Sequence, residues 1–83
     1  MNRELVWTEK FKTDVKHFKD SSLLEKLRKQ IEKILENPEI GKPLRYNLKG
    51  ERTIYVKPYR ILYAFDDKNI YLLRFEHRGH AYD

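Results

Sequence analysis

Residues 52–63 constrain the fold of this chain more than any other stretch. Their sequence is Arg-Thr-Ile-Tyr-Val-Lys-Pro-Tyr-Arg-Ile-Leu-Tyr, in which β-branched and aromatic residues form two runs on either side of Lys57-Pro58. Proline has no N–H to donate and a fixed φ, so Pro58 suits a turn or a strand edge and not the interior of a helix. The stretch therefore predicts a β-hairpin that turns at Lys57-Pro58.

Alternation along a strand decides which side chains of this hairpin share a face. In the first strand Ile54 and Val56 point to one side, and Tyr55 and Lys57 point to the other. In the second strand Arg60 lies on the side opposite its aromatic neighbours. A hairpin that buries its apolar side then presents Tyr55, Lys57 and Arg60 together, and these are the first candidates for a functional site.

Positive charge is concentrated in the same region. The formal net charge is +5, and residues 42–60 alone carry +5, whereas residues 1–41 and 61–83 come to +1 and −1. The region holds a basic strip of six residues, namely Lys42, Arg45, Lys49, Arg52, Lys57 and Arg60. A basic strip on one β element is the expected footprint of a polyanion, so the charge favours a nucleic-acid partner.

Length and composition set limits on the class of protein. A chain of 83 residues forms one domain, expected to span residues 1–83, whose small core every element must share. It has no cysteine, which excludes disulfides and thiolate metal sites and suits a reducing compartment. No apolar run approaches the roughly 20 residues that span a bilayer, and no export signal is visible, so we expect a cytoplasmic protein without a membrane partner.

Two amphipathic helices are predicted upstream of the hairpin. Glu4–Trp7 is expected to be a short strand, and Thr8 can cap a helix whose buried stripe includes Phe11 and Val15. Ser22 and Glu25 have the spacing of a capping box, which predicts that a second helix begins there. Its apolar residues follow the helical period as far as Asn37-Pro38, where it ends. The aromatic residues expected in the core are Trp7, Phe11, Phe18, Phe65 and Phe75.

Two further strands complete the predicted sheet. Leu44 to Leu48 is a possible strand, and residues 66–69 form a polar turn before a final strand at Ile70 to His77. In the final strand the side with Arg74 and Glu76 is expected to be exposed. The opposite, buried side is expected to hold Tyr71, Leu73 and Phe75, which leaves Ile70 and Leu72 on the exposed side. If the same alternation continues past His77, Arg78 is on the exposed side. It then lies beside Lys57 and Arg60 if the strands pair as a meander.

The predicted fold is therefore of the α+β class. The two helices form an antiparallel hairpin whose apolar stripes cover a curved antiparallel sheet of three or four strands, because neither helix can bury its own apolar face. Burial of an apolar side chain contributes about 1.5–3 kcal/mol, which outweighs a surface ion pair at about 0–1 kcal/mol. The charged faces of the helices are accordingly expected to be solvated exteriors.

Two sequence motifs then point to a known family. Tyr59-Arg60-Ile61-Leu62-Tyr63 matches a "Tyr-Arg-aliphatic-x-Tyr" strand, and His77-Arg78-Gly79-His80-Ala81-Tyr82 matches a last strand that ends "His-Arg-x-x-x-Tyr". Leu48, Gly50 and Arg52 stand where members often have a Leu-x-Gly approach. With its predicted order of strand, helix hairpin and sheet, the chain resembles the RelE/ParE toxin superfamily over essentially its whole length.

This resemblance implies a toxin of a type II toxin–antitoxin system. The superfamily is divided between ribosome-dependent mRNA endonucleases and inhibitors of DNA gyrase. RelE-like members act on mRNA in the ribosomal A site, where the 2′-hydroxyl attacks the adjacent phosphate in line and leaves a cyclic phosphate, with no metal and no cofactor. The implied partners are a RelB-like antitoxin, the ribosome and mRNA.

The resemblance also implies roles for particular residues. Arg60 matches the arginine that stabilises the phosphate, Arg78 matches a second functional arginine, and Tyr82 matches a C-terminal tyrosine that stacks on or orients the substrate base. Lys57 is a candidate for cationic or general-base help, the latter only with a strongly lowered pKa. The expected RNA-binding residues are Arg45, Lys49, Arg52, Tyr55 and Lys57.

The chain departs from the family where active members usually carry two basic residues before the Tyr-Arg motif. Thr53 and Tyr55 occupy those positions here. His77 and His80 are then the candidates for proton transfer, because histidine titrates near neutral pH without special tuning.

Two questions stay open on the sequence alone. The first is whether Arg60 and Arg78 simply pair with acidic residues of an exposed sheet, for which Asp66, Asp67 and Glu76 are available. The second is which activity the fold carries: an endoribonuclease, a gyrase inhibitor or a non-enzymatic RNA-binding module. A cluster of histidines, arginines and tyrosine favours the first, because a pure binder needs no acid–base groups.

Overall fold

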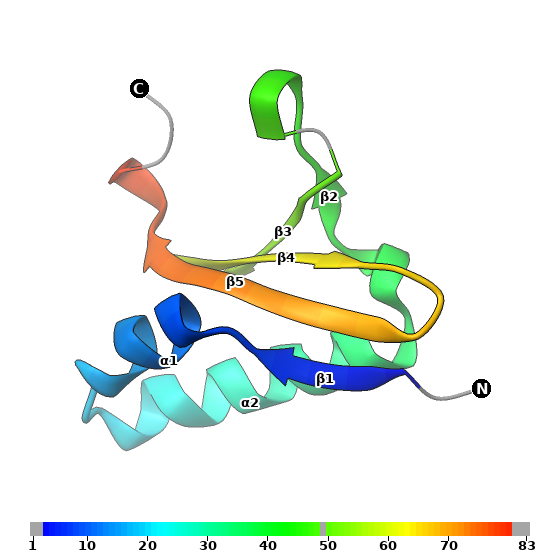
Figure 1. Ribbon diagram of the computed structural model, residues 1–83. Coiled ribbons are helices and arrows are strands. Elements are labelled where there is room, and N and C mark those ends of the chain that lie inside the picture. The colour runs from blue at the N-terminus through cyan, green and yellow to red at the C-terminus, as the bar shows by residue number, and fades with distance from the viewer. Residues whose placement is uncertain (1–2, 49, 81–83) are drawn as a thin grey trace.

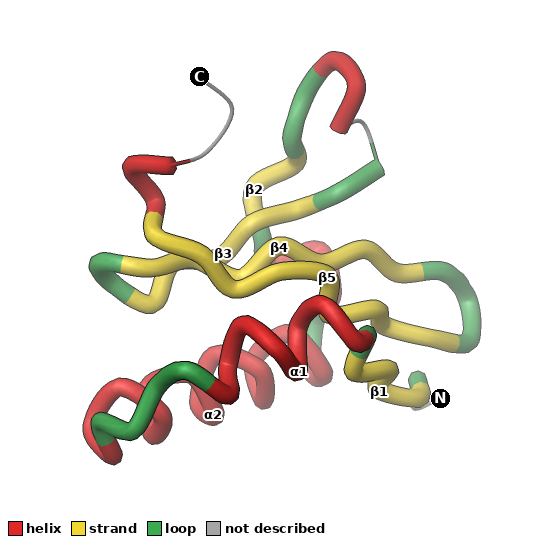
Figure 2. The backbone as a smooth tube through the Cα atoms, turned by 60° about the vertical axis from the view of Figure 1, so that its left-hand side comes forward, coloured by secondary structure: helices red, strands yellow, loops and turns green. Residues whose placement is uncertain are grey.

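The computed structural model describes residues 3–48 and 50–80 of the chain, and of Asn47 and His80 it describes the backbone alone. Two helices lie against one face of a five-stranded sheet and run in opposite directions (Figures 1 and 2). The predicted layering of a helix hairpin on a sheet is thereby confirmed.

The elements predicted from the sequence are present except the strand at Leu44 to Leu48, and short 3₁₀ turns follow α2, β2 and β5. The strands and helices are β1 (Glu4–Trp7), α1 (Glu9–Lys16), α2 (Ser21–Glu36), β2 (Lys42–Pro43), β3 (Arg52–Val56), β4 (Tyr59–Phe65) and β5 (Asn69–His77). The sheet has the order β1-β5-β4-β3-β2. All pairs are antiparallel except β1 with β5, so the sheet is mixed and has five strands, where the sequence predicted an antiparallel sheet of three or four.

Both helix starts are set by capping side chains. Thr8 caps α1 as predicted, since its Oγ1 accepts the N–H of Phe11. The prediction that Ser22 caps the second helix was wrong by two residues. Asp20 is the N-cap, and its carboxylate accepts the N–H groups of both Ser22 and Leu23. A carboxylate that satisfies two of the free N–H groups leaves no need for the predicted capping box.

The core lies between the helices and the sheet. Its buried members are Phe11, Leu27, Ile31, Ile34, Val56, Ile61, Tyr63, Ile70, Leu72 and Phe75. Of the aromatic residues expected there, Phe18 and Phe65 are partly buried and pack against this cluster. Trp7 is 39% exposed because it ends β1, an edge strand, although its ring still meets Phe11 edge-on.

Tyr63 ties the sheet to the segment that follows α2. Its hydroxyl donates to the carbonyl of Pro38 and accepts the N–H of Gly41, at 2.6 and 2.8 Å. Its ring is fully buried, and burial raises the pKa of Tyr63 above its ordinary value. These two bonds fix where the chain leaves the helix layer and enters β2.

The strand predicted at Leu44 to Leu48 does not form. Within residues 42–48, only Lys42–Pro43 pairs with β3. Tyr46–Leu48 is a 3₁₀ turn in which Tyr46 has a φ of 61°. A positive φ breaks the extended backbone that alternation assumes, and Tyr46 is accordingly 88% exposed.

A β-bulge in β5 changes the phase of that strand. Phe65 pairs with Ile70, but Arg60 pairs with Glu76, because the register shifts by one residue beside Leu62 and Tyr63. The predicted alternation was therefore right for Phe75 and wrong for the first half of the strand. Ile70 and Leu72 are buried in the core, where the sequence placed them on the exposed side.

Candidate active site

The candidate residues lie on the outer face, which we define as the side of the sheet opposite the helices. On this side residues 42–48 rise at one end and the short turn Arg78–His80 rises at the other (Figure 1). Across the floor, Tyr55 of β3, Arg60 of β4 and Glu76 of β5 are direct neighbours in register. Directly paired residues point to the same side of a sheet, so these three side chains form one row.

Arg60 is buried in this row. The sequence placed it on an exposed face, but the residue is only 7% exposed. Its Nη2 lies 3.7 Å from Oε2 of Glu76, a contact between charges that is too long for a hydrogen bond. A guanidinium that is this deeply buried in close-packed protein has few alternative positions, so its charge is localised on the outer face.

Glu76 belongs to a longer chain of charges. Arg74 lies 3.6 Å from the other oxygen of Glu76 and 3.1 Å from Oε1 of Glu51. The ion chain Glu51–Arg74–Glu76–Arg60 thus contains two positive and two negative groups, and each side chain is less than a third exposed. Of the three acidic residues considered as partners for Arg60, Glu76 is the one that contacts it.

Arg78 approaches the row from the end of β5. Its guanidinium carbon lies 5.2 Å from the centre of the Tyr55 ring, within cation–π distance, and its backbone N–H bonds to the carbonyl of Pro58. The ring of Tyr55 is part of a side chain that is 40% exposed. The structure therefore brings Arg78 to the same face as Tyr55 and Arg60, as the meander predicted.

His77 lies on the opposite face. It pairs with Tyr59, and its ring meets the Tyr59 ring edge-on at 5.5 Å, while Tyr59 packs against Phe18 below the sheet. Its Nδ1 accepts the N–H of Gly79. The structure does not bring this imidazole to Arg60, because consecutive residues of a strand point to opposite sides.

The basic strip is divided between several places. Arg52 lies on the helix side of β3, where its guanidinium donates to the carbonyls of Glu39 and Gly41. Arg45 is exposed in the segment before β3, and Lys57 is exposed in the turn between β3 and β4. Of the expected RNA-binding residues, Tyr55 alone is in direct register with Arg60.

Three of the predicted site residues fall outside what the structure describes. They are Lys49, Tyr82 and the side chain of His80. Their predicted roles in RNA binding, stacking and proton transfer stay predictions.

Sequence reasoning missed the ion chain as a functional unit. On the sequence alone, Glu76 is a candidate only for neutralising an exposed arginine, and Arg74 and Glu51 have no predicted role. The sequence does contain a signal, because Arg74 and Glu76 alternate with apolar residues in β5 and so share a face. Without the bulge, however, the register would have placed Phe75 opposite Arg60.

Within residues 3–48 and 50–80, no group of three or more His, Cys, Asp or Glu side chains is arranged to hold a metal ion. Among the described helices, none has the length and apolar character needed to cross a membrane.

The geometry of the outer face suits an anionic ligand with a planar part. Arg60 offers a fixed positive charge, Glu76 offers a carboxylate that can accept a proton, and the Tyr55 ring carries a second guanidinium on its face. A nucleotide has a phosphate for the first group and a base for the aromatic ring.

Comparison with known proteins bears on the family and the fold of the chain. Residues 5–82 match the family model described as the ParE toxin of the type II toxin–antitoxin system parDE. No curated protein matches the chain significantly.

Solved structures of toxins have the same fold. A chain of the RelBE2 toxin–antitoxin complex from Mycobacterium tuberculosis is 26% identical, with a TM-score of 0.79 over 94% of this chain and 100% of that one. YafQ from E. coli strain BL21(DE3) is 26% identical, with a TM-score of 0.70 over 98% and 99% of the two chains. A YoeB/ParE toxin from Agrobacterium tumefaciens has a TM-score of 0.81 over 90% and 98% at 19% identity, a likeness of fold alone.

Proposed function

The chain belongs to the ParE toxin family of type II toxin–antitoxin systems, and from the geometry of its outer face we propose that it is a toxin that cleaves mRNA on the ribosome. The observation that carries this proposal is the buried guanidinium of Arg60 beside the carboxylate of Glu76 on the outer face. A surface that only binds RNA has no need of a buried cation and an adjacent proton acceptor, whereas phosphodiester cleavage uses both.

The reaction would be an in-line displacement within the RNA. The 2′-oxygen forms a bond to the adjacent phosphorus, the bond from phosphorus to the 5′-oxygen breaks, and the products are a cyclic phosphate and a 5′-hydroxyl. A base takes the proton of the 2′-hydroxyl, and an acid or water returns one to the leaving oxygen. Arg60 would stabilise the negative charge that develops on the phosphorane oxygens.

Glu76 is the described group best situated to be the base. Its carboxylate lies against Arg60, so a phosphate bound to the guanidinium would have the 2′-hydroxyl of the preceding nucleotide nearby. Arg74 holds the second oxygen of Glu76 and would position it. This assignment replaces His77, which faces the helices, whereas His80 remains the candidate for the acid.

A second candidate function is inhibition of DNA gyrase. It is favoured by the family model itself, which is that of the ParE toxins. In this case the outer face would serve binding alone, and neither Arg60 nor Glu76 would act on a phosphodiester bond.

In either case we propose an antitoxin as the partner that keeps the chain inactive. The solved relatives include toxin–antitoxin complexes such as RelBE2. An antitoxin segment that covers the outer face and the basic strip would use apolar anchors for affinity and acidic residues for steering. Copurification with the product of a neighbouring gene, and its rescue of growth, would test this pairing.

One experiment separates the two functions. An mRNA is translated in a purified extract with and without the protein, and the 5′ ends are mapped by primer extension, while a parallel reaction measures gyrase supercoiling. The proposal expects cuts within ribosome-bound codons and normal supercoiling. If the mRNA stays uncut and supercoiling is blocked, the assignment as an endoribonuclease is wrong and the protein is a gyrase inhibitor.

A further inference from the structure

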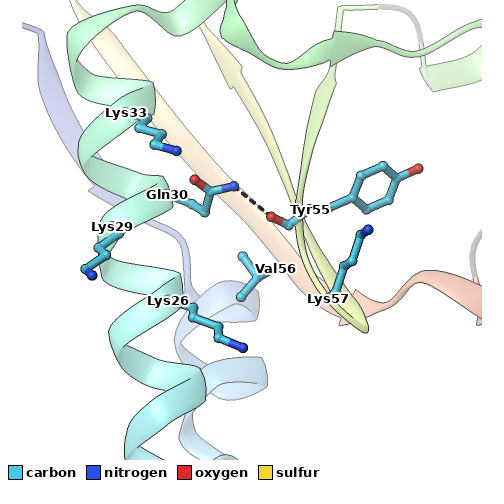
Figure 3. A pocket seen from close by; sticks show the side chains of 7 residues that line it. All are labelled: Lys26, Lys29, Gln30, Lys33, Tyr55, Val56 and Lys57. Atoms are coloured by element: carbon cyan, nitrogen blue, oxygen red, sulfur yellow. Dashed lines mark hydrogen bonds between the residues drawn. The ribbon is translucent and has the colours of Figure 1, made fainter.

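A second basic surface lies away from the outer face, in a hollow between α2 and the edge of the sheet. Its volume is about 270 Å³. Figure 3 shows the residues that line it, which are Lys26, Lys29, Gln30 and Lys33 of α2 and Tyr55, Val56 and Lys57 of the hairpin. The floor is the side chain of Val56, and the rim carries four lysines and no acidic residue.

Three of the four lysines of this hollow have no charged partner among the described residues. Within the described part of the chain, Lys26, Lys33 and Lys57 take part in no ion pair or hydrogen bond through their side chains. Elsewhere on α2 the same helix does pair its charges, since Arg28 is bound by both Glu25 and Glu32.

Such a cluster has a cost for the isolated protein. Like charges three or four residues apart on a helix destabilise it by a few tenths of a kcal/mol per pair. Lys26, Lys29 and Lys33 have this spacing, and Lys57 adds a fourth charge across the hollow. A polyanion that occupies the hollow would convert this repulsion into attraction.

The strand edge beside the hollow argues against a peptide strand as the occupant. β4 pairs with β3 along its whole length, but β2 pairs only with Arg52 and Thr53. On the side away from β4, no described strand therefore lies beside the end of β3. There, Gln30 already donates to the carbonyl of Tyr55 at 2.8 Å (Figure 3), which is the acceptor that an added strand would need. The hollow therefore offers ammonium groups and not backbone bonds.

We propose that this lysine hollow binds the sugar–phosphate backbone of structured RNA in the ribosome. Lysine is a strongly hydrated point charge that contacts phosphates without requiring one geometry, which suits a backbone contact that carries no sequence information. Tyr55 joins the two surfaces, because its carbonyl faces the hollow and its ring lies on the outer face under Arg78. The inference rests on the proposed function and deepens it: the ribosomal RNA would be held next to the strand that is cut.

The test compares two double variants of equal charge. Lys26→Gln/Lys33→Gln removes two charges from the hollow, and Lys57 is left intact because it is a candidate for the cleavage site. Lys16→Gln/Lys68→Gln removes two exposed lysines from α1 and from the β4–β5 turn, neither of which lines the hollow. Binding of each protein to purified ribosomes is measured at several salt concentrations, and mRNA cleavage is measured at saturating ribosomes.

The expected result is specific to the hollow. The logarithm of the association constant for ribosomes falls linearly with the logarithm of the salt concentration, and the loss of two phosphate contacts makes this slope shallower by roughly 1.5. At about 0.1 M salt the variant should therefore bind ribosomes roughly 10- to 40-fold more weakly. The rate of cleavage at saturation should not change, and the control variant should bind as the wild type does.

Other outcomes would overturn the inference or the function separately. If the hollow variant binds ribosomes with the same affinity and slope as the control variant, the inference fails while cleavage by the wild type still supports the proposed function. If the hollow variant loses affinity for the antitoxin but not for ribosomes, the site takes an acidic protein and the RNA assignment is wrong. If the wild type binds ribosomes through these lysines and cuts no mRNA, the proposed function fails alone.

Discussion

Replacement of Arg60 by methionine separates its role in cleavage from its role in the fold. Methionine keeps much of the volume of the buried side chain and removes its charge, so it avoids the cavity that alanine would leave. The proposed chemistry requires the charge at the phosphorane. The variant should therefore lose a factor of about 10²–10³ in cleavage rate, which corresponds to about 3–4 kcal/mol.

The burial of Arg60 adds an effect on stability that an exposed residue would not have. At 3.7 Å the attraction between Arg60 and Glu76 is about 4 kcal/mol at an effective dielectric constant of 20. The desolvation of both groups offsets much of this gain. Removal of the guanidinium leaves Glu76, which is 26% exposed, with Arg74 as its neighbour. We expect a net loss of about 1–3 kcal/mol in the free energy of unfolding.

The two effects are measured separately. Urea unfolding gives the stability, and single-turnover cleavage of ribosome-bound mRNA gives the rate at a temperature where the variant is fully folded. Arg28→Met is the matched control, because Arg28 is an exposed arginine that is also paired with two carboxylates. It should keep the wild-type rate and show little change in stability, because an exposed ion pair contributes little to the free energy of unfolding.

The double variant Arg60→Met/Glu76→Gln strengthens the test. It removes the carboxylate that the single variant leaves without Arg60, so it should recover part of the lost stability. The rate should not recover, because both groups proposed for the chemistry are then absent. Cleavage by the folded Arg60→Met variant within threefold of the wild-type rate would refute the assignment of Arg60 to the phosphate.

Three further predictions concern the fold. Tyr63→Phe should lose about 1–3 kcal/mol in urea unfolding at pH 7, because the N–H of Gly41 and the carbonyl of Pro38 are left unpaired. Burial raises the pKa of Tyr63, so its hydroxyl contributes fully to the free energy of unfolding below about pH 10, and this contribution is lost as the pH rises through the folded pKa. The free energy of unfolding of the phenylalanine variant should therefore fall less steeply in alkali than that of the wild type. The same alkaline dependence in both proteins would contradict this. Gly41→Ala should prevent folding as judged by circular dichroism, since its Cβ would lie 2.5 Å from the hydroxyl oxygen of Tyr63 and 2.9 Å from the carbonyl oxygen of Thr53; a folded variant would show that this segment can move. The N–H groups of Lys68 and Asn69 lower the pKa of Asp66, so the carboxylate contributes to the free energy of unfolding above about pH 4, and this contribution is lost as the pH falls. Asp66→Asn should therefore flatten the dependence of the unfolding free energy on pH in acid. An unaltered dependence would show that this turn is not its source.

The sequence predicted the elements whose signals are local. Thr8 caps α1, Asn37-Pro38 ends α2, and Glu4–Trp7 forms β1 with the predicted bounds. These features depend on a side chain and its neighbours a few residues away, which a linear pattern contains. The cap of α2 was misplaced because Asp20, Ser21 and Ser22 are all capable of capping a helix, and only the backbone around them decides which one does.

The failures have a different cause. Alternation predicts a strand at Leu44 to Leu48, but it does not reveal that Tyr46 adopts a positive φ. The edge strand β1 leaves Trp7 partly exposed, which depends on the order of strands in the sheet and not on its hydrophobicity.

The bulge in β5 is the feature on which the candidate site most depends. Near the turn the register pairs Phe65 with Ile70, and an uninterrupted ladder would continue to pair Arg60 with Phe75. An aromatic ring would then share the face of Arg60, and Glu76 would point toward the helices, where a carboxylate is costly. The one extra residue lets the first half of β5 bury Ile70 and Leu72 while the second half buries Phe75 and turns Arg74 and Glu76 outward. The strand is apolar on both sides near its start and charged on one side near its end. It can bury Ile70, Leu72 and Phe75 and also keep Arg74 and Glu76 on the outer face only if its alternation shifts by one residue. The same change of phase sets Glu76 against Arg60, so the packing of the core and the pairing of the two candidate groups have a single origin.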